Sequence, residues 1–172
     1  MGVTYSTTNA GATYTAIASF ASNGVLTSYV FGAANTLPQT YTDLVLIVND
    51  PNSTLNFDVR VIFNNDTTAT YSRTGLRSIA GNYTFRQTAL NSVILGSYGG
   101  ANWCRPSIAH ILSYKNASVY KTVLDQTGDA ATGMGAQVQL WRNTNAITQL
   151  EVQTSLAMNA GATISLYGIL AA

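Results

Sequence analysis

His110 and Cys104 are the only histidine and the only cysteine in the 172-residue chain, and their side chains are the natural candidates for metal binding or nucleophilic attack. Neither belongs to an H-x-H, C-x-x-C or HExxH pattern, which would supply further ligands at short spacing. His110 lies within the apolar stretch 108–112, so we interpret it as a core or interface histidine. Because Pro106 interrupts a regular strand between the two residues, we interpret Cys104 as a packing residue.

Asp43 and Asp58 could form the pair of carboxylates with which glycosidases act. They lie on neighbouring expected strands, so hydrolysis of a capsule or cell-wall glycan is one alternative. Asp58, however, belongs to the polar face of its strand, where an arginine such as Arg60 can neutralise it. The sequence also has no G-x-S-x-G motif and no phosphate-binding or dinucleotide-binding glycine motif. We therefore expect a protein that is not an enzyme and has no catalytic, cofactor-binding or metal-binding residue.

Charge is scarce in this chain. Charged residues make up 9% of it, against about 25% in an average soluble domain, and the formal net charge is +1. Such a chain has no long-range field to attract a polyanion, so we expect neither nucleic acid nor a membrane as a partner. The single cysteine excludes an internal disulfide bond. The longest uncharged apolar run is 44–48, which is far shorter than the roughly 18 residues of a membrane-spanning helix.

The composition favours strands over helices. Exposed helix surfaces are usually built from Glu, Lys, Gln and Arg, and this chain has one Glu and two Lys. Threonine, with 23 residues, and the ten tyrosines pack well on a pleated sheet. The clearest alternation is in 55–63 (LNFDVRVIF), where the odd positions are apolar. Further strands are expected at 13–20, 25–31, 41–49, 83–95, 107–114, 119–125, 137–141, 147–154 and 163–169.

Turn-forming residues separate these segments and indicate a sandwich. They include 22–24 (SNG), 49–52 (NDPN), 64–66 (NND), 97–100 (SYGG), 126–129 (QTGD) and 159–161 (NAG), and 130–135 (AATGMG) is expected to be a mobile loop. A single sheet of about ten strands would leave one apolar face in water, so two packed sheets are favoured. We predict an all-β, antiparallel, jelly-roll-like sandwich over 13–172, preceded by a flexible segment at 1–12. In the last strand, Gly168 should leave a gap on the face of Ile164 into which a backbone or an aromatic ring fits.

Five segments resemble a family of small virion structural proteins of tailed bacteriophages. They match its P-x-T-Y-T-D-L strand, F-N-x-D turn before a Y-S pair, Y-K-T strand, W-R-S-T-x-A-I-T hairpin and terminal S-L-Y-G-I strand in order and spacing. Here they read 37–46 (LPQTYTDLVL), 61–66 (VIFNND) with 71–72 (YS), 120–123 (YKTV), 140–148 (LWRNTNAIT) and 164–169 (ISLYGI).

The resemblance implies a phage particle component with a β-sandwich fold and a trimeric assembly. Two positions depart from the family pattern. Asn65 takes the place of a glycine, which is tolerable because asparagine enters left-handed conformations more readily than most residues. After Ser72 the family commonly has L-Y-G, whereas this chain has Leu76, Arg77 and Ser78. None of the matched residues is a catalytic group, so the resemblance transfers a fold and particle membership rather than an active site.

Two functions are compatible with this resemblance. The first is a homotrimeric capsid decoration, or cement, protein on the virion surface that binds the phage major capsid protein and stabilises the head lattice. A compact domain without a coiled-coil or collagen-like shaft and a near-neutral surface favour it. The alternative is a tail-fibre or tail-tip adhesin that binds tail proteins and a host glycan or protein. Ten tyrosines and two tryptophans favour it, because aromatic rings stack on sugars.

Overall fold

The computed structural model describes residues 14–49, 59–78, 81–96, 106–129 and 133–170. Within these ranges the chain forms strands and one 3-10 helix, Ala33–Asn35. The strands are β1 (Tyr14–Asn23), β2 (Ser28–Phe31), β3 (Asp43–Asn49), β4 (Val59–Phe63), β5 (Tyr71–Ser78), β6 (Asn82–Leu90), β7 (Val93–Leu95), β8 (Ser107–Leu112), β9 (Lys121–Asp129), β10 (Gly133–Trp141), β11 (Leu150–Thr154) and β12 (Ala160–Ile169). No helix in the described ranges is long and apolar enough to cross a membrane.

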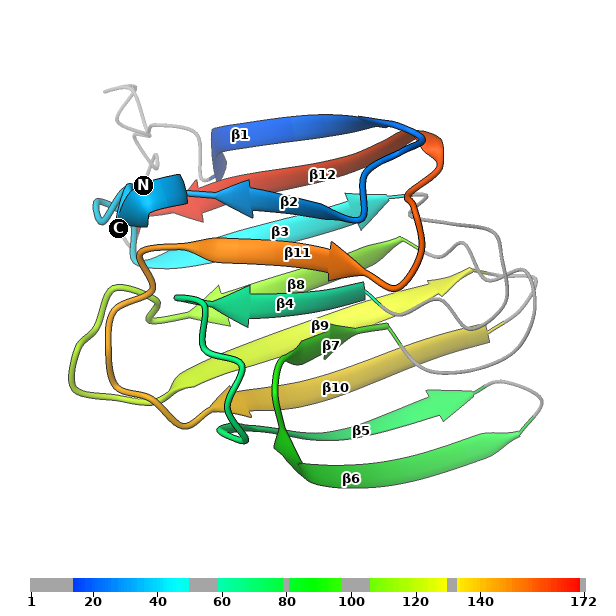
Figure 1. Cartoon of the computed structure of the whole chain (residues 1–172). Helices are drawn as coiled ribbons and strands as arrows, with labels where there is room; N and C mark the ends of the chain where they lie inside the picture. The colour runs from blue at the N-terminus through cyan, green and yellow to red at the C-terminus, as the bar shows by residue number, and fades with distance from the viewer. Residues whose placement is uncertain (1–13, 50–58, 79–80, 97–105, 130–132, 171–172) are drawn as a thin grey trace, which may run out of the picture.

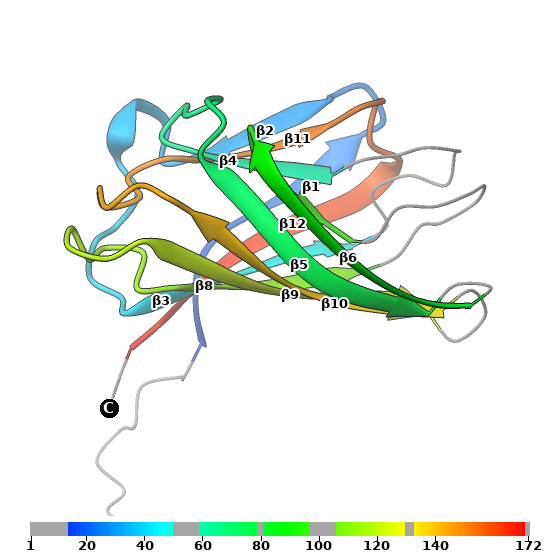
Figure 2. The same cartoon turned by 90° about the horizontal axis from the view of Figure 1, so that it is seen from below.

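The strands form two antiparallel sheets that pack against each other, as the sequence predicted. The large sheet has the order β1-β12-β3-β8-β9-β10-β5-β6, and the small sheet has the order β2-β11-β4-β7. Figure 1 shows the small sheet lying over the large one, and Figure 2 shows the two layers with β2, β11 and β4 on one side and β8, β9 and β10 on the other. The fold is therefore an all-β sandwich.

The strand order is that of a jelly roll with two insertions. The strands β1-β12-β3-β8 of the large sheet and β2-β11-β4-β7 of the small sheet have the order of the two four-stranded sheets of a jelly roll, and the chain crosses between these two units at nearly every step. Such crossing connections form the two Greek keys of a jelly roll. The pairs β5-β6 and β9-β10 are inserted into this path, and both extend the large sheet beyond β8 (Figure 1). The insertions double the width of one sheet.

The core between the sheets is apolar and contains a group of three aromatic side chains near the end of the sandwich where β10 ends. The indole ring of Trp141 stacks on Tyr71 with ring centroids 6.1 Å apart and meets Phe63 edge-on at 5.4 Å. All three side chains are at most 1% exposed. They come from β10, β5 and β4, so the group joins the inserted strands to the small sheet. Edge-to-face and stacked aromatic pairs stabilise such contacts by about 1 kcal/mol beyond their buried area.

The C-terminal strand β12 lies inside the large sheet, between β1 and β3. Its register pairs Leu166 with Leu46 and Gly168 with Leu44. A Cβ atom on Gly168 would overlap the ring of Tyr41, which fills the space that the missing side chain leaves. The gap expected at Gly168 is therefore present, and an aromatic ring occupies it.

The sequence prediction was wrong about the number and the length of some strands. The expected strand 83–95 is two strands, β6 and β7, which lie in different sheets. Ala89 has a positive φ of 57°, so the backbone leaves the β conformation before the second strand begins. β5 was not predicted at all. The described ranges therefore contain twelve strands, where about ten were expected.

The predicted turn at 126–129 is strand, and so are residues 133–135 of the predicted loop 130–135. β9 continues to Asp129 and β10 begins at Gly133, and the two pair with each other as far as Asp129 and Gly133. Their small residues have low strand propensity. Both strands, however, have a second partner, because Thr127 pairs with Ser107 of β8 and Met134 pairs with Ser78 of β5. Pairing on both sides outweighs the local preference for a turn. Residues 130–132 and the expected flexible segment 1–12 lie outside the described residues.

Candidate functional site

The outer face of the large sheet is an apolar surface. We use this name for the side chains of β3, β8, β9, β10 and β5 that point away from the small sheet. Alternation along the strands defines them, because Ala109, Ile111 and Val123 are buried while their neighbours in sequence are more exposed. Register places them in two rows: Ile47, Ile108, Gln126, Ala136 and Leu76, and Val45, His110, Leu124, Val138 and Thr74.

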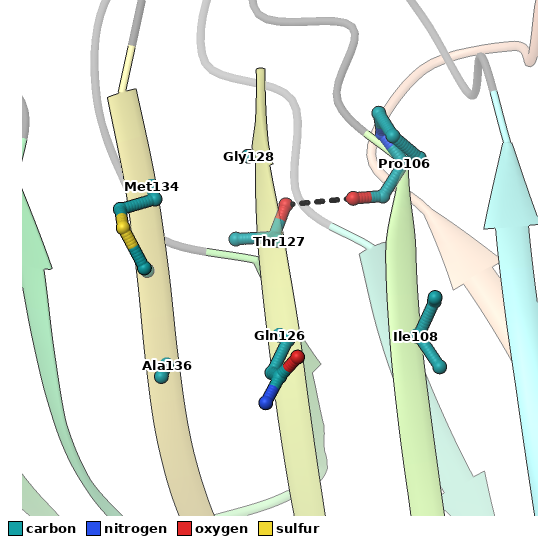
Figure 3. Close-up of a pocket in the computed structure, with 8 residues that line it drawn as sticks. Pro106, Ile108, Gln126, Thr127, Gly128, Met134 and Ala136 are labelled. Carbon is teal, nitrogen blue, oxygen red and sulfur yellow. Dashed lines mark hydrogen bonds between the residues drawn. The ribbon is translucent and has the colours of Figure 1, made fainter. Parts of the chain in front are cut away.

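An open hollow of about 370 Å³ lies at one end of this face, over β8, β9 and β10. Figure 3 shows Ile108, Gln126 and Met134 on these three neighbouring strands around the hollow. Thr127 Oγ1 donates a 3.1 Å hydrogen bond to the carbonyl oxygen of Pro106 at its rim. Among the described residues, no acidic or basic side chain lines the hollow. Its described lining is suited to contact with an apolar side chain.

His110 lies in the middle of the outer face and is partly buried. Its cross-strand neighbours are Val45 on β3 and Leu124 on β9, which have no group that could share a proton or a metal with it. No group of three or more His, Cys, Asp or Glu side chains with metal-binding geometry occurs among the described residues. His110 therefore lies outside the core between the sheets, and its role at an interface stays a prediction, whereas Cys104 lies outside the described residues.

The two strands expected to carry Asp43 and Asp58 belong to different sheets. Asp43 begins β3 of the large sheet, while β4, which follows Asp58 in the chain, belongs to the small sheet. Asp43 Oδ1 accepts a hydrogen bond from the backbone amide of Ser113, which gives it a role in the turn after β8. Asp58 itself lies outside the described residues. The strand adjacency on which the glycosidase alternative was based is therefore wrong.

A different carboxylate, Asp66, is the centre of a hydrogen-bond network. Its side chain accepts bonds from Thr68 N at 3.0 Å, from Thr70 Oγ1 at 3.0 Å and from Trp141 Nε1 at 2.7 Å. Partial burial by itself would raise the pKa of Asp66, but the donors outweigh this effect and lower it to about 2. A carboxylate with so many donors is held in one position and stays ionised, which is typical of a structural group.

The turn before Asp66 depends on two asparagines. Asn64 and Asn65 have φ values of 51° and 58°, in the left-handed region that asparagine tolerates better than most residues. The glycine-like role inferred for Asn65 is therefore confirmed. Asn64 Oδ1 accepts hydrogen bonds from the amides of Thr148 and Gln149, and Asn64 Nδ2 donates to the carbonyl of Ala146. The turn thus holds the connection between β10 and β11.

Segments that carry the family resemblance meet around this connection, residues 142–149. Arg142 Nη1 donates to Ser72 Oγ at 3.0 Å, and Lys121 Nζ donates to the carbonyl of Thr144 at 2.9 Å. Gln39 Nε2 donates to the carbonyl of Ile147 at 2.9 Å. The motifs therefore form the scaffold at one end of the sandwich. The sequence predicted these motifs only as separate segments. Their polar residues next to turns were a signal that the motifs could bind one another.

Lys121 is fully buried, and its ammonium group serves this scaffold. Nζ donates to the carbonyl oxygens of Val119 at 2.7 Å and Thr144 at 2.9 Å. Burial lowers its pKa, because the charged form loses its hydration. Hydrogen bonds to two loop carbonyls compensate part of that loss and fix the two loops to each other.

Asp125 belongs to a second buried polar group, between the two sheets. Asp125 Oδ2 accepts hydrogen bonds from Gly96 N at 2.9 Å and from Gln137 Nε2 at 2.6 Å. Gln139 binds both the amide and the carbonyl of Ile94. Burial raises the pKa of Asp125 to about 6, and the hydrogen bonds and the charge of Arg73 oppose this increase. These side chains tie the edge strand β7 to the large sheet.

Comparison of the sequence with protein-family models and with curated proteins found no match to either. The described residues thus offer one broad apolar contact surface and two buried polar groups that hold the fold together. The geometry defines a jelly-roll domain with a face suited to protein contact.

Proposed function

We propose that this protein is a non-enzymatic structural component of a phage particle, a homotrimeric decoration protein that binds the major capsid protein and stabilises the head lattice. The observation that carries the proposal is the widened jelly roll with a broad, uncharged outer face. Jelly rolls with two Greek keys are common in viral capsid proteins. The fold does not define a function by itself, so the surface must support it.

The surface supports contact with protein. The rows of the outer face contain neither an acidic nor a basic residue other than His110. A contiguous apolar surface of this kind on a monomer marks a site of interaction. A decoration protein needs such contacts in many copies, because a repeating lattice turns weak single contacts into strong overall binding.

A tail-fibre or tail-tip adhesin that binds a host glycan or protein is the second candidate, since jelly rolls also occur in lectins. Sugar binding would require exposed aromatic rings close together. Trp141 is fully buried. The exposed tyrosines of the described residues are separated along the large sheet, with Tyr14 and Tyr83 on its edge strands β1 and β6 and Tyr120 just before the inner strand β9. The described aromatic residues therefore favour the decoration protein over the adhesin.

Immunogold labelling of particles tests the proposal. Antibodies against the purified protein are applied to intact phage and viewed by electron microscopy. Label spread over the head is the expected result. Label confined to the tail tip would replace the decoration role with that of an adhesin, and particles without label would contradict both.

A further inference from the structure

We propose that the outer face of the large sheet is the surface through which copies of this chain bind one another, with three copies arranged around a threefold axis and this face turned towards the axis. The inference rests on the homotrimer of the proposed function and names the surface that forms it. The binding partner of this face is a second copy of the same chain.

Four large apolar side chains on this face are exposed in the single chain, whereas Val45 on β3 is 1% exposed. Leu124 is 41% exposed, Ile108 43%, Val138 51% and Leu76 52%. They come from four strands that are neighbours in the sheet, so register brings them side by side. Scattered apolar residues are ordinary on protein surfaces, but a contiguous patch on adjacent strands is a recognisable interface.

The area of the face is in the range of stable protein contacts. The four strands β8, β9, β10 and β5, spaced about 4.8 Å apart, carry the two central rows and the flanking rows of Thr122 and Met134, about 7 Å apart, and cover about 500 Å² of flat sheet. Around a threefold axis each copy shares this face between two neighbours, so the three copies together bring about 1,500 Å² into contact, and stable interfaces bury about 1,200–2,000 Å². Side chains raise the accessible area above this flat value.

The charge of the face favours a copy of the same chain as the partner. Around a symmetry axis a charged residue approaches its own copies, and like charges in a buried contact oppose association. The two central rows contain His110 and otherwise uncharged side chains. The nearest charged residues are at the margins, with Asp43 at the start of β3 and Arg86 opposite Thr74 on β6.

The outer face of the small sheet has a different composition. Arg60 on β4 is exposed, and Glu151 and Gln153 on β11 are partly exposed. These side chains lie on the two central strands of that sheet. A polar surface with both signs of charge is typical of a face in contact with water. The asymmetry between the two outer faces therefore assigns the contact between copies to the large sheet.

Replacement of Val138 by arginine tests the inference. Val138→Arg places a charge at the centre of the face on each copy, whereas the matched control Val30→Arg places it on the small sheet, opposite Glu151. Mass is measured by light scattering after size exclusion, and folding by circular dichroism. We expect the wild-type protein and the control to have three times the 18.2 kDa of one chain, and Val138→Arg to be a folded monomer. Leu76→Arg gives the same test if Val138→Arg does not fold.

The outcomes separate the interface from the proposed function. If the wild-type protein and both outer-face variants are all trimers, the interface lies elsewhere and the homotrimer stands. If the wild-type protein is a dimer that Val138→Arg dissociates, the threefold arrangement is wrong. A wild-type monomer would overturn the inference and the homotrimer together, while labelled phage heads would still support decoration. A monomer that binds phage heads, and whose binding Val138→Arg abolishes, would assign the face to the capsid protein instead.

Discussion

The indole Nε1 of Trp141 donates a 2.7 Å hydrogen bond to Asp66 Oδ2, although 75 residues separate them in the chain. Asp66 follows β4 of the small sheet, and Trp141 ends β10 of the large sheet. The bond therefore joins the two layers at the end of the sandwich where the connection 142–149 is held. Loss of the acceptor oxygens at this point would leave the buried indole N–H unsatisfied, which is costly.

Asp66→Asn tests this bond. The amide offers one acceptor oxygen in place of two, so we expect the free energy of unfolding to fall by about 1–3 kcal/mol. The folded-state pKa of about 2 is below the ordinary 3.8, so the stabilisation by ionised Asp66 is complete above pH 3.8 and is lost as the pH falls towards 2. Urea unfolding of the wild type and the variant between pH 2 and 6 measures it. Glu151→Gln, at a partly exposed carboxylate of the small sheet, is the control for the change in net charge, and equal losses in the two variants would contradict the prediction.

Asp125→Asn should stabilise the protein as the pH rises, in contrast to Asp66→Asn, which should destabilise it. The folded-state pKa of about 6 exceeds 3.8, so the native protein binds the extra proton between these values and the wild type loses stability as the pH increases through them. Asparagine resembles the protonated acid and avoids this loss. We expect the free energy of unfolding of the variant to rise relative to that of the wild type by on the order of 2 kcal/mol between pH 4 and 6. Above pH 6 this difference should stay constant. A stability difference that is constant from pH 4 to 8 would show that Asp125 does not titrate in this range.

Gly168→Ala should destabilise the fold by about 1–3 kcal/mol, the usual effect of inserting a group into a packed core. The added methyl group would overlap the ring of Tyr41. Tyr41→Ala removes the obstacle, so the double variant should lose less than the sum of the two single losses. Thermal unfolding of the four proteins forms the double-mutant cycle, and additive losses would mean that ring and glycine are not in contact.

Oxidation of Met134 tests whether other copies of the chain cover the outer face in solution. It is 56% exposed in the single chain and lines the hollow on that face, whereas Met158 is 1% exposed in the core. Peroxide converts accessible methionines to sulfoxides, and mass spectrometry of peptides gives the rate at each position. We expect Met134 to oxidise several-fold more slowly in the wild-type trimer than in Val138→Arg, with Met158 slow in both. Equal Met134 rates in the two proteins would show that this end of the face stays open.

The sequence was sufficient to predict the fold class and several local features. Period-two alternation is a property of neighbouring residues, so it indicated most strands and the two-layer sandwich. The left-handed turn at Asn65 and the gap at Gly168 were also predicted, since each depends on the conformational range of one residue. The absence of helix-forming surface residues excluded a helical protein for the same local reason.

β5 shows why other elements could not be predicted. Its inward-facing side chains include Arg73 and Arg77, which lie over the rings of Phe85 and Tyr83 at 5.1 and 5.4 Å. Arginines in these positions remove the apolar alternation by which strands are recognised. Their aromatic partners come from β6, so the strand is understood only when the hairpin is formed.

The outer face and the Asp66 network were decided by tertiary structure alone. Alternation along one strand indicates that Ile108 or Val138 lies on a face, but it cannot tell which strands are neighbours or which face the second sheet covers. Those choices depend on pairing between segments far apart in the chain, as Trp141 and Asp66 are. Sequence determined the period of each strand because that is a short-range property, and the fold determined the partners because pairing is a long-range one.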